Sequence, residues 1–247
     1  MDRNYAAAYK ELYRHHWWWR AREDFLVRVL TRLQPPGGWE RLLDVGCGDA
    51  LFFDRLQAFG LVEGVEEDSS LVDPSGRWAS QIYLQSFTGA FEPDHRYGLI
   101  LMLDVLEHLP APLDALRKAG RLLMANGQVV ITVPAFQALW TAHDEANHHF
   151  ARYTRRGVSR LVERAGLRVE SASYFFHWMV PVKLAVRLKE TLLGSRSGHE
   201  RLPPAVVNRL LHGVSRVEQR VLGRAPLPFG TSLLIVATAA AVAGGRS

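Results

Sequence analysis

Short apolar runs alternate with amphipathic stretches along most of the chain. Seven runs have the length and composition of buried strands: residues 41–45, 61–65, 81–86, 97–105, 127–133, 167–176 and 231–239. Helices are predicted at residues 4–33, 49–59, 113–124 and 154–165, with glycine or proline close to their ends. Strands and helices that alternate in this way predict an α/β fold, in which helices cover both faces of a mostly parallel sheet.

A longer segment, residues 181–227, separates the last two predicted strands. Two helical patterns lie in it, around residues 184–193 and 206–222. The second carries an apolar stripe that consists of Val207, Leu210, Leu211, Val214, Val217, Val221 and Leu222. We therefore expect a single domain over residues 1–247. Its expected parts are an N-terminal helical cap (1–38), a core (39–180), a helical insertion (181–227) and a final strand with its tail (228–247).

Composition narrows the setting of this domain. Of the 247 residues, 48% are apolar and 22% are charged, so the chain can bury a sizeable core and disorder is not expected. Cys47 is the single cysteine, which excludes a disulfide framework and favours a reducing cytoplasm. The N-terminus lacks the apolar segment of a signal peptide, and the apolar run at 233–245 is too short to span a membrane. We therefore expect a cytoplasmic protein.

The sequence LDVGCGDA, residues 43–50, joins the first predicted strand to a helix. Glycines in such a loop let the backbone turn tightly and approach a nucleotide-like ligand. A dinucleotide loop would have a third glycine at position 51, where this chain has leucine, and would avoid acids beside a pyrophosphate. Asp44 and Asp49 flank the loop instead. Two acids favour a ligand that has cationic groups and no phosphate, such as S-adenosylmethionine (SAM).

Glu66 follows the second predicted strand, about 20 residues past the loop, where an acid commonly meets a ribose. Its carboxylate could accept hydrogen bonds from both ribose hydroxyls. The alternative interpretation is an exposed loop acid that binds no ligand.

Four motifs, in this order, resemble those of class I SAM-dependent methyltransferases, in particular the group that includes ubiquinone-type O-methyltransferases. They are LDVGCGDA (43–50), GVEE (64–67), YGLILMLDVLEHL (97–109) and GQVVITVPA (127–135). The resemblance implies a Rossmann-like seven-stranded sheet of order 3-2-1-4-5-7-6 with an antiparallel last strand. It also implies that residues 39–180 bind SAM and that S-adenosylhomocysteine is a product. Ala50 departs from the family pattern, which usually has glycine there.

The resemblance also implies which residues hold the cofactor. Asp44, Gly46 and Gly48 would contact the methionine end of SAM, and Glu66 the ribose. An acid after the third strand often meets the adenine amine in this family, whereas this chain has no acid there. The cofactor-binding candidates are Asp44, Gly46, Gly48, Asp49, Glu66, Ser86, Phe87 and Asp104.

The methyl acceptor is expected beyond the carboxyl ends of the fourth and fifth strands, where ligands bind in open α/β sheets. Methyl transfer is an in-line displacement, so the enzyme mainly aligns two reactants and supplies a base only when the acceptor must lose a proton. His108 follows the fourth strand, and its ordinary pKa suits proton removal near neutral pH. The alternative is a histidine that orients its loop through hydrogen bonds.

Residues 141–154 follow the fifth strand and are rich in polar side chains. They resemble a segment of a bacterial subset of the family, in which a His-Asp pair precedes His-x-x-Arg-Tyr. The catalytic candidates are His108, His149 and Tyr153, and the candidates for substrate contact are Trp18, Trp140, His143, Asp144 and Arg152. The spacing of the histidines matches no established zinc pattern, so pairing among loop residues is favoured over a metal site.

Positive charge is concentrated in the insertion, within a chain whose net charge is +5. Its basic residues are Lys183, Arg187, Lys189, Arg196, Arg201, Arg209, Arg216, Arg220 and Arg224. Together with the apolar stripe, they are consistent with a helical platform on a membrane surface that takes a lipid-linked acceptor. The alternative is a pair of helices whose apolar face packs on the domain or forms a homodimer.

The sequence thus favours a SAM-dependent methyltransferase that acts on an oxygen or nitrogen of a small-molecule, sugar or lipid-linked acceptor in secondary or cell-envelope metabolism. An RNA methyltransferase is the enzymatic alternative. No separate RNA-binding module is visible, and DVLEHL lacks the Asn/Asp-Pro-Pro-aromatic signature of base methylation, so nucleic acid is not expected as a partner. A SAM-binding subunit without catalysis is the non-enzymatic alternative.

Overall fold

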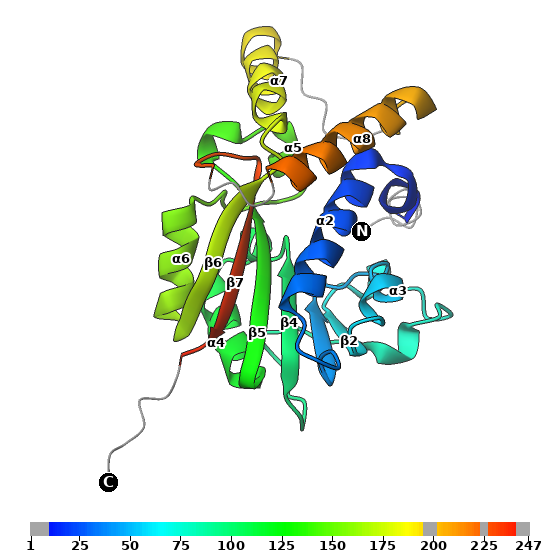
Figure 1. The fold of residues 1–247 in the computed structure, drawn as a ribbon, viewed down its shortest axis with the longest axis vertical. Coiled ribbons are helices and arrows are strands. Elements are labelled where there is room, and N and C mark those ends of the chain that lie inside the picture. Colours follow the sequence, from blue (N-terminus) through cyan, green and yellow to red (C-terminus); the bar gives the residue numbers. More distant parts are fainter. Residues whose placement is uncertain (1–9, 195–201, 223–226, 241–247) are drawn as a thin grey trace.

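A seven-stranded sheet forms the centre of the molecule (Figure 1), in a computed structural model that describes residues 10–194, 202–222 and 227–240. The strands are β1 (Arg41–Val45), β2 (Leu61–Glu66), β3 (Ile82–Leu84), β4 (Tyr97–Leu103), β5 (Leu123–Pro134), β6 (Leu167–Phe175) and β7 (Ser232–Ala239). Their order is β3-β2-β1-β4-β5-β7-β6, and β7 runs antiparallel to both of its neighbours. The predicted fold class and strand order are confirmed.

Helices cover both faces of this sheet (Figure 1). They are α2 (Trp17–Leu33), α3 (Phe53–Leu56), α4 (Pro112–Leu122), α5 (Ala142–Ala146), α6 (Arg155–Arg164), α7 (Met179–Leu193) and α8 (Ala205–Val221). One buried apolar cluster joins the sheet to α4 and α6, and a second joins the opposite face to α2 and α3. Strand residues alternate between these two clusters, as the two faces of a pleated strand require.

The predicted helix at 49–59 is wrong in extent, because only α3, four residues long, is helical. Turns precede α3, and Ala50 within them adopts a left-handed backbone with φ of 55°. This left-handed conformation has a higher conformational free energy for alanine, which has a Cβ, than for glycine. The usual glycine at this position of the motif is consistent with that difference. The glycine loop thus continues further than the apolar spacing predicts.

The predicted helix at 113–124 ends two residues early, at Leu122. Leu123 already belongs to β5 and pairs with Tyr97 at the start of β4. Sheet pairing therefore ends this helix before the Asn-Gly pair at 126–127, which suggested a helix end. β5 accordingly begins four residues before the predicted strand at 127–133.

The predicted N-terminal helix is interrupted. Residues 10–15 are helical, but His16 has an extended backbone, and α2 begins at Trp17. The imidazole of His16 accepts a hydrogen bond from the backbone N–H of Trp18 (3.2 Å) and so caps α2, as polar side chains do at helix starts. The predicted residues 4–9 lie outside the described part of the chain.

The two predicted insertion helices are present as α7 and α8. α7 begins at Met179 and includes Pro181, because proline is tolerated in the first turn of a helix. α8 packs across α2 (Figure 1), where the side-chain oxygen of Asn208 accepts a hydrogen bond from the backbone N–H of Trp17 (2.8 Å). Among the described helices, none is long and apolar enough to cross a membrane.

The apolar stripe of α8 faces away from the domain. Leu210, Val217 and Val221 are 64%, 60% and 71% exposed. The opposite, polar side of the helix is buried, at Ser215, Glu218 and Gln219. The interpretation in which this stripe packs on the domain is therefore wrong, since the contact with α2 uses polar side chains instead.

Candidate functional site

The glycine loop lies at the carboxyl end of β1, between β2 and β4. Gly46 and Gly48 have φ of 69° and 54°, left-handed values that residues with a side chain rarely adopt. At Gly46, an added Cβ would also lie only 3.1 Å from Cγ2 of Val105. Both glycines are therefore needed to turn the backbone at this edge of the sheet.

Glu66 closes the glycine loop from the end of β2. Its Oε2 accepts a hydrogen bond from the N–H of Gly48 and its Oε1 accepts one from the N–H of Asp68, both at 2.9 Å. The residue is buried, at 8% exposure. Each carboxylate oxygen can accept a second hydrogen bond, so Glu66 can hold the loop and two ligand hydroxyls together.

Arg22 of α2 is a buried cation at this edge that the sequence analysis did not identify. Its Nη2 lies 2.7 Å from Oδ2 of Asp104 and donates to Oγ1 of Thr132 (3.1 Å). Thr132 in turn donates to Oδ1 of Asp104 (3.0 Å). The sequence signal that could have identified Arg22 is its position on the apolar side of a helix, among residues that are buried against the sheet.

Burial raises the pKa of the Asp44 carboxyl to about 7, although the charge of Arg22 opposes the rise and that of Glu66 adds to it. The carboxyl is therefore poised to ionise when a cationic ligand group approaches. Asp49, on the other side of the loop, is paired with Lys10 (2.7 Å) and accepts a hydrogen bond from the N–H of Asp73 (2.7 Å).

Ser86 and Phe87, the two residues expected near an adenine, differ in how far their side chains are exposed. The ring of Phe87 is buried in the core, 6.0 Å from the ring of Phe91 and 5.8 Å from Nζ of Lys118. Ser86 is half-buried, and its carbonyl accepts hydrogen bonds from Gly89 and Phe91. Of these two residues, Phe87 therefore has its side chain in the core, whereas Ser86 is partly accessible.

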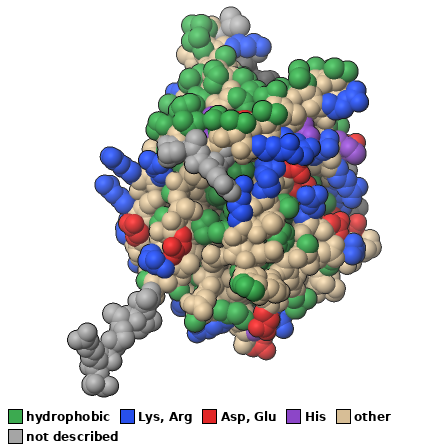
Figure 2. All heavy atoms as spheres, viewed as in Figure 1, with side chains coloured by type: hydrophobic (Ala, Val, Ile, Leu, Met, Phe, Trp, Pro, Cys, Tyr) green, Lys and Arg blue, Asp and Glu red, His purple; other side chains and the backbone are tan. Residues whose placement is uncertain are grey.

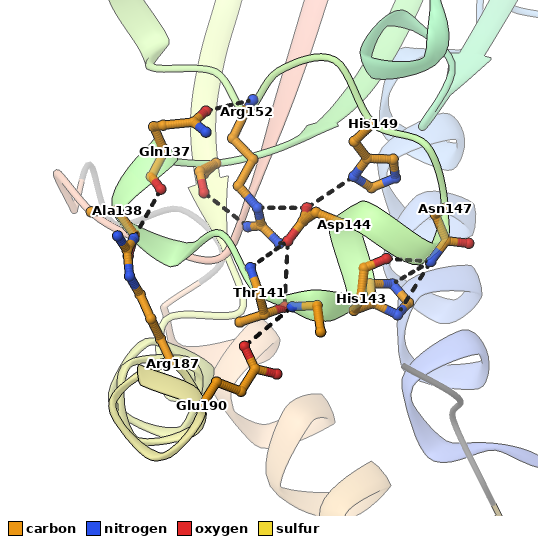
Figure 3. Close-up of polar contacts among 12 residues, drawn as sticks. Gln137, Ala138, Thr141, His143, Asp144, Asn147, His149, Arg152, Arg187 and Glu190 are labelled. Carbon is orange, nitrogen blue, oxygen red and sulfur yellow. Dashed lines mark hydrogen bonds and ion pairs between the residues drawn. The ribbon is translucent and has the colours of Figure 1, made fainter. Parts of the chain in front are cut away.

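The segment between β5 and α6 is organised around Asp144, which is fully buried on α5 (Figure 3). Arg152 donates two hydrogen bonds to it, from Nε to Oδ1 (2.8 Å) and from Nη2 to Oδ2 (3.0 Å), and Nδ1 of His149 donates to Oδ1 (2.9 Å). Burial alone would raise the pKa of Asp144, but these hydrogen bonds and the charge of Arg152 outweigh it and hold that pKa well below its usual range. Asp144 and Arg152 thus pair with each other inside the loop.

Three histidines lie together in this region. The rings of His108 and His149 are nearly perpendicular, with centroids 4.7 Å apart, and the ring of His143 lies 6.4 Å from that of His149. Burial lowers the pKa of His143 to about 4, with a further contribution from Lys183. His143 is therefore neutral at physiological pH. The structure thus brings His108 and His149 together, although 41 positions separate them in the sequence.

Two hydrogen bonds join this segment to the short helix η3 (Leu106–His108), which follows β4. Phe150 donates its N–H to the carbonyl of Glu107 (2.7 Å), and the Tyr153 hydroxyl donates to the carbonyl of Leu106 (3.0 Å). Burial and the nearby Glu107 raise the pKa of Tyr153 to about 12. The phenol therefore stays protonated and anchors the segment.

The two candidate tryptophans lie on different elements. Trp18 is half-buried on α2 and stacks on Phe176, with ring centroids 6.1 Å apart. Trp140 is half-buried at a hollow that is also lined by Arg187 and Glu190 of α7. Arg187 donates to the carbonyl of Gln137 (3.1 Å), so α7 is attached to the same segment as the histidines (Figure 3).

Comparison with known proteins identifies the family. A family model described as a methyltransferase domain matches residues 15–172. A ubiquinone biosynthesis O-methyltransferase of Coxiella burnetii (strain RSA 493 / Nine Mile phase I) is 24% identical over 150 residues, which are 53% of this chain and 64% of that protein. One of Xanthomonas axonopodis pv. citri (strain 306) is 23% identical over 197 residues, which are 68% of this chain and 79% of that protein. The chain thus spans less than two thirds of the length of the Coxiella relative.

Solved structures show the same fold. The complex between the Haloferax volcanii Trm112 methyltransferase activator and a putative methyltransferase matches with a TM-score of 0.60 at 15% identity, over 96% of this chain and 94% of that one. A putative methyltransferase from Bacillus halodurans C-125 matches with a TM-score of 0.55 at 15% identity, over 85% and 97%. With the family match over residues 15–172 and the strand order of the sheet, the chain belongs to the class I SAM-dependent methyltransferases.

Proposed function

We propose that this enzyme transfers the methyl group of SAM to an oxygen of a small acceptor that is lipid-linked. The observation that carries the proposal is the pair of histidines, His108 and His149, whose rings meet at the short helix η3 that follows β4. A neutral imidazole can accept the proton that a hydroxyl acceptor loses. The names of the curated relatives, ubiquinone biosynthesis O-methyltransferases, favour oxygen over nitrogen.

Six residues are proposed to hold SAM: Asp44, Gly46, Gly48, Asp49, Glu66 and Asp104. The buried acid Asp44 suits the ammonium group, and Glu66 suits the ribose hydroxyls. Ser86 and the backbone of Phe87 are proposed to meet the adenine. Arg22 joins this set as a positioning residue, because it fixes Asp104.

His149 is proposed as the base, since Asp144 holds its Nδ1 and orients the ring. His108 is proposed to line the same acceptor site, together with Trp18, Trp140 and His143. Tyr153, Asp144 and Arg152 are proposed as positioning residues, because their polar groups bind the protein itself.

Methyl transfer can be measured with SAM that is labelled in its methyl group. The purified chain is incubated with fractions of a cell extract: polar metabolites, membrane lipids and RNA. Label is expected in the lipid fraction, as a base-stable ether. Label in RNA alone would favour the RNA methyltransferase, and label in no fraction would favour the non-catalytic subunit.

The affinity for SAM is expected to depend on pH through Asp44. Because the pKa of this carboxyl is about 7, the ionised fraction falls about tenfold from pH 8 to pH 6, and the affinity falls with it if the carboxylate binds the ammonium group. Calorimetry at several pH values measures this. The Asp44→Asn variant should bind SAM more weakly than the wild type, and its affinity should no longer change between pH 6 and pH 8. A wild-type affinity that is constant over this range would contradict the role of Asp44.

The lipid-linked acceptor is inferred from the exposed faces of α7 and α8 (Figure 2). Large apolar side chains lie open on both helices: Val182, Leu184, Val186, Leu188, Leu192, Val206, Val207, Leu210, Val214, Val217 and Val221. Apolar patches of this kind commonly mark sites of association with another molecule.

Charge decides which partner suits this surface. The described residues of α7 and α8 include the bases Lys183, Arg187, Lys189, Arg209, Arg216 and Arg220. The two acids point inward, since Glu190 accepts a hydrogen bond from the N–H of Ala142 (3.2 Å) and Glu218 one from Nδ1 of His177 (2.6 Å). Lys189, Arg209 and Arg220 are exposed, whereas Arg187 donates to the carbonyl of Gln137 and Arg216 lies 3.7 Å from Asp24. Exposed bases beside open apolar side chains favour an anionic lipid surface.

Vesicle flotation tests this surface. At low salt the protein is expected to float with anionic vesicles and to stay in solution with neutral ones. The double variant Leu210→Glu/Val217→Glu should no longer float, whereas Leu61→Glu, at an exposed apolar residue on β2, should behave like the wild type. If the wild type stays in solution and light scattering shows a dimer that the double variant abolishes, the surface is a homodimer contact instead.

A further inference from the structure

We propose that Lys10 competes with the ammonium group of SAM for the carboxylate of Asp49, so that the N-terminal segment restrains cofactor binding. Nζ of Lys10 lies 2.7 Å from Oδ2 of Asp49, the residue that follows the second glycine of the loop. A lysine at this place presents the same kind of N–H donors as the ammonium group of SAM. The inference rests on the proposed role of Asp49 in holding SAM, and it assigns to Lys10 the opposite effect.

The carboxylate of Asp49 is largely buried, and its two oxygens have different partners. Its side chain is 14% exposed, and Oδ1 accepts a hydrogen bond from the backbone N–H of Asp73 (2.7 Å). This backbone contact ties the glycine loop to the loop that follows β2. The ion pair with Lys10 involves a flexible side chain that is 29% exposed, so it is the contact that a second ammonium group can replace.

A second acid holds Lys10 beside the glycine loop. Its Nζ lies 3.7 Å from Oδ2 of Asp73, whose Oδ1 accepts hydrogen bonds from the N–H (3.0 Å) and the hydroxyl (2.7 Å) of Ser75. The lysine thus lies between two acids that belong to different loops. A cationic ligand that approaches Asp49 meets the positive charge of Lys10, and repulsion between like charges opposes its binding until the lysine moves away.

A break in the N-terminal helix fixes the segment that carries the lysine. Residues 10–15 are helical, and the extended backbone of His16 separates them from α2. Asn208 of α8 spans this break, because its Oδ1 accepts a hydrogen bond from the N–H of Trp17 (2.8 Å) and its Nδ2 donates to the carbonyl of His15 (2.7 Å). The segment is therefore anchored at the end next to α2, and the ion pair with the glycine loop holds its other end.

The exposure of the ion pair sets the size of the effect. Exposed ion pairs are weak, so removal of the Lys10 charge is expected to raise the affinity for SAM about two- to fivefold. A contact of this strength restrains binding without preventing it, because SAM displaces the lysine once its concentration is high enough. The segment thereby adjusts the concentration of SAM at which the site fills.

Calorimetric titration of the full chain and of its Lys10→Met variant tests the competition without an acceptor. SAM and S-adenosylhomocysteine both carry the ammonium group, and each should bind Lys10→Met about two- to fivefold more tightly than the wild type. Methylthioadenosine keeps the adenosine and the sulfur but lacks the ammonium group, so the variant and the wild type should bind it equally. A lysine that only stabilised the fold of the segment would change the affinities for all three ligands together.

Arg14→Met is the matched control, because it removes the same charge from the same helical segment at an exposed residue. This variant and Lys10→Arg, which keeps the ion pair, should bind all three ligands like the wild type. The proposal is overturned if Lys10→Met binds SAM no more tightly than the wild type, or if methylthioadenosine gains as much affinity as SAM. A wild type that binds neither SAM nor S-adenosylhomocysteine would instead contradict the proposed cofactor residues themselves, and with them the competition.

Discussion

Replacing Glu66 by glutamine is expected to weaken SAM binding by about 100-fold or more. The carboxylate would lose its charge-assisted hydrogen bonds to the ribose hydroxyls, each worth about 1.5–3 kcal/mol, and 1.4 kcal/mol corresponds to a factor of ten. The amide also leaves one loop N–H facing another donor, because Glu66 now accepts from both Gly48 and Asp68. Calorimetric titration with SAM and with S-adenosylhomocysteine measures the loss.

The neighbouring Glu67→Gln is the matched control, since Glu67 is exposed at the same strand end. It should bind SAM like the wild type. Asp44→Ala should weaken binding as severely as Glu66→Gln. Unchanged affinity in both Asp44→Ala and Glu66→Gln would show that the cofactor does not bind at the glycine loop in the proposed way.

Removal of the Asp144 carboxylate is expected to lower the free energy of unfolding by about 3–5 kcal/mol. Asp144→Ala leaves the Arg152 guanidinium, 4% exposed, without its bidentate partner, and an uncompensated buried charge is costly. Urea unfolding followed by circular dichroism measures the change. The contacts between η3 and the segment that joins β5 to α6 should weaken first, because Phe150 and Tyr153 of this segment bind η3.

The double variant Asp144→Ala/Arg152→Met distinguishes the cost of an unpaired buried charge from the cost of the other contacts that Asp144 makes. Removing both charges should restore part of the stability that Asp144→Ala loses, because no buried charge remains. A loss below about 1 kcal/mol in the single variant, or no recovery in the double variant, would mean that the pair contributes little to holding the segment.

The class of the fold follows from the sequence because local patterns specify it. Buried strands that alternate with helices leave few topologies, and the resemblance of four motifs to class I methyltransferases implied the order among them. Boundaries were less predictable. Leu123 joins β5 because Tyr97 is there to pair with it, and α2 starts at Trp17 because His16 can cap it.

Only part of the site was predictable. Asp44, Gly46, Gly48 and Glu66 occupy one local motif and the strand beside it, so sequence spacing brings them together. Arg22 was missed, because a helix pattern marks the buried face without showing that a charge on it meets Asp104. The meeting of His108 and His149 was not predictable, because it depends on the segment that packs above η3.

What the sequence determined by itself is the set of buried strands and helices and the glycine loop, since these depend on residues close together in the chain and on alternation that repeats along it. The order of the strands followed from the resemblance of its motifs to a known family. The tertiary structure alone decided that Arg152 pairs with Asp144, that His149 meets Glu107 and His108, and that α8 buries its polar side. Periodicity shows that a helix has two unlike faces, but which face is covered depends on the shape and charge of distant elements. On α8 it is the hydrogen-bonding groups of α2 that decide, and the apolar stripe is left exposed.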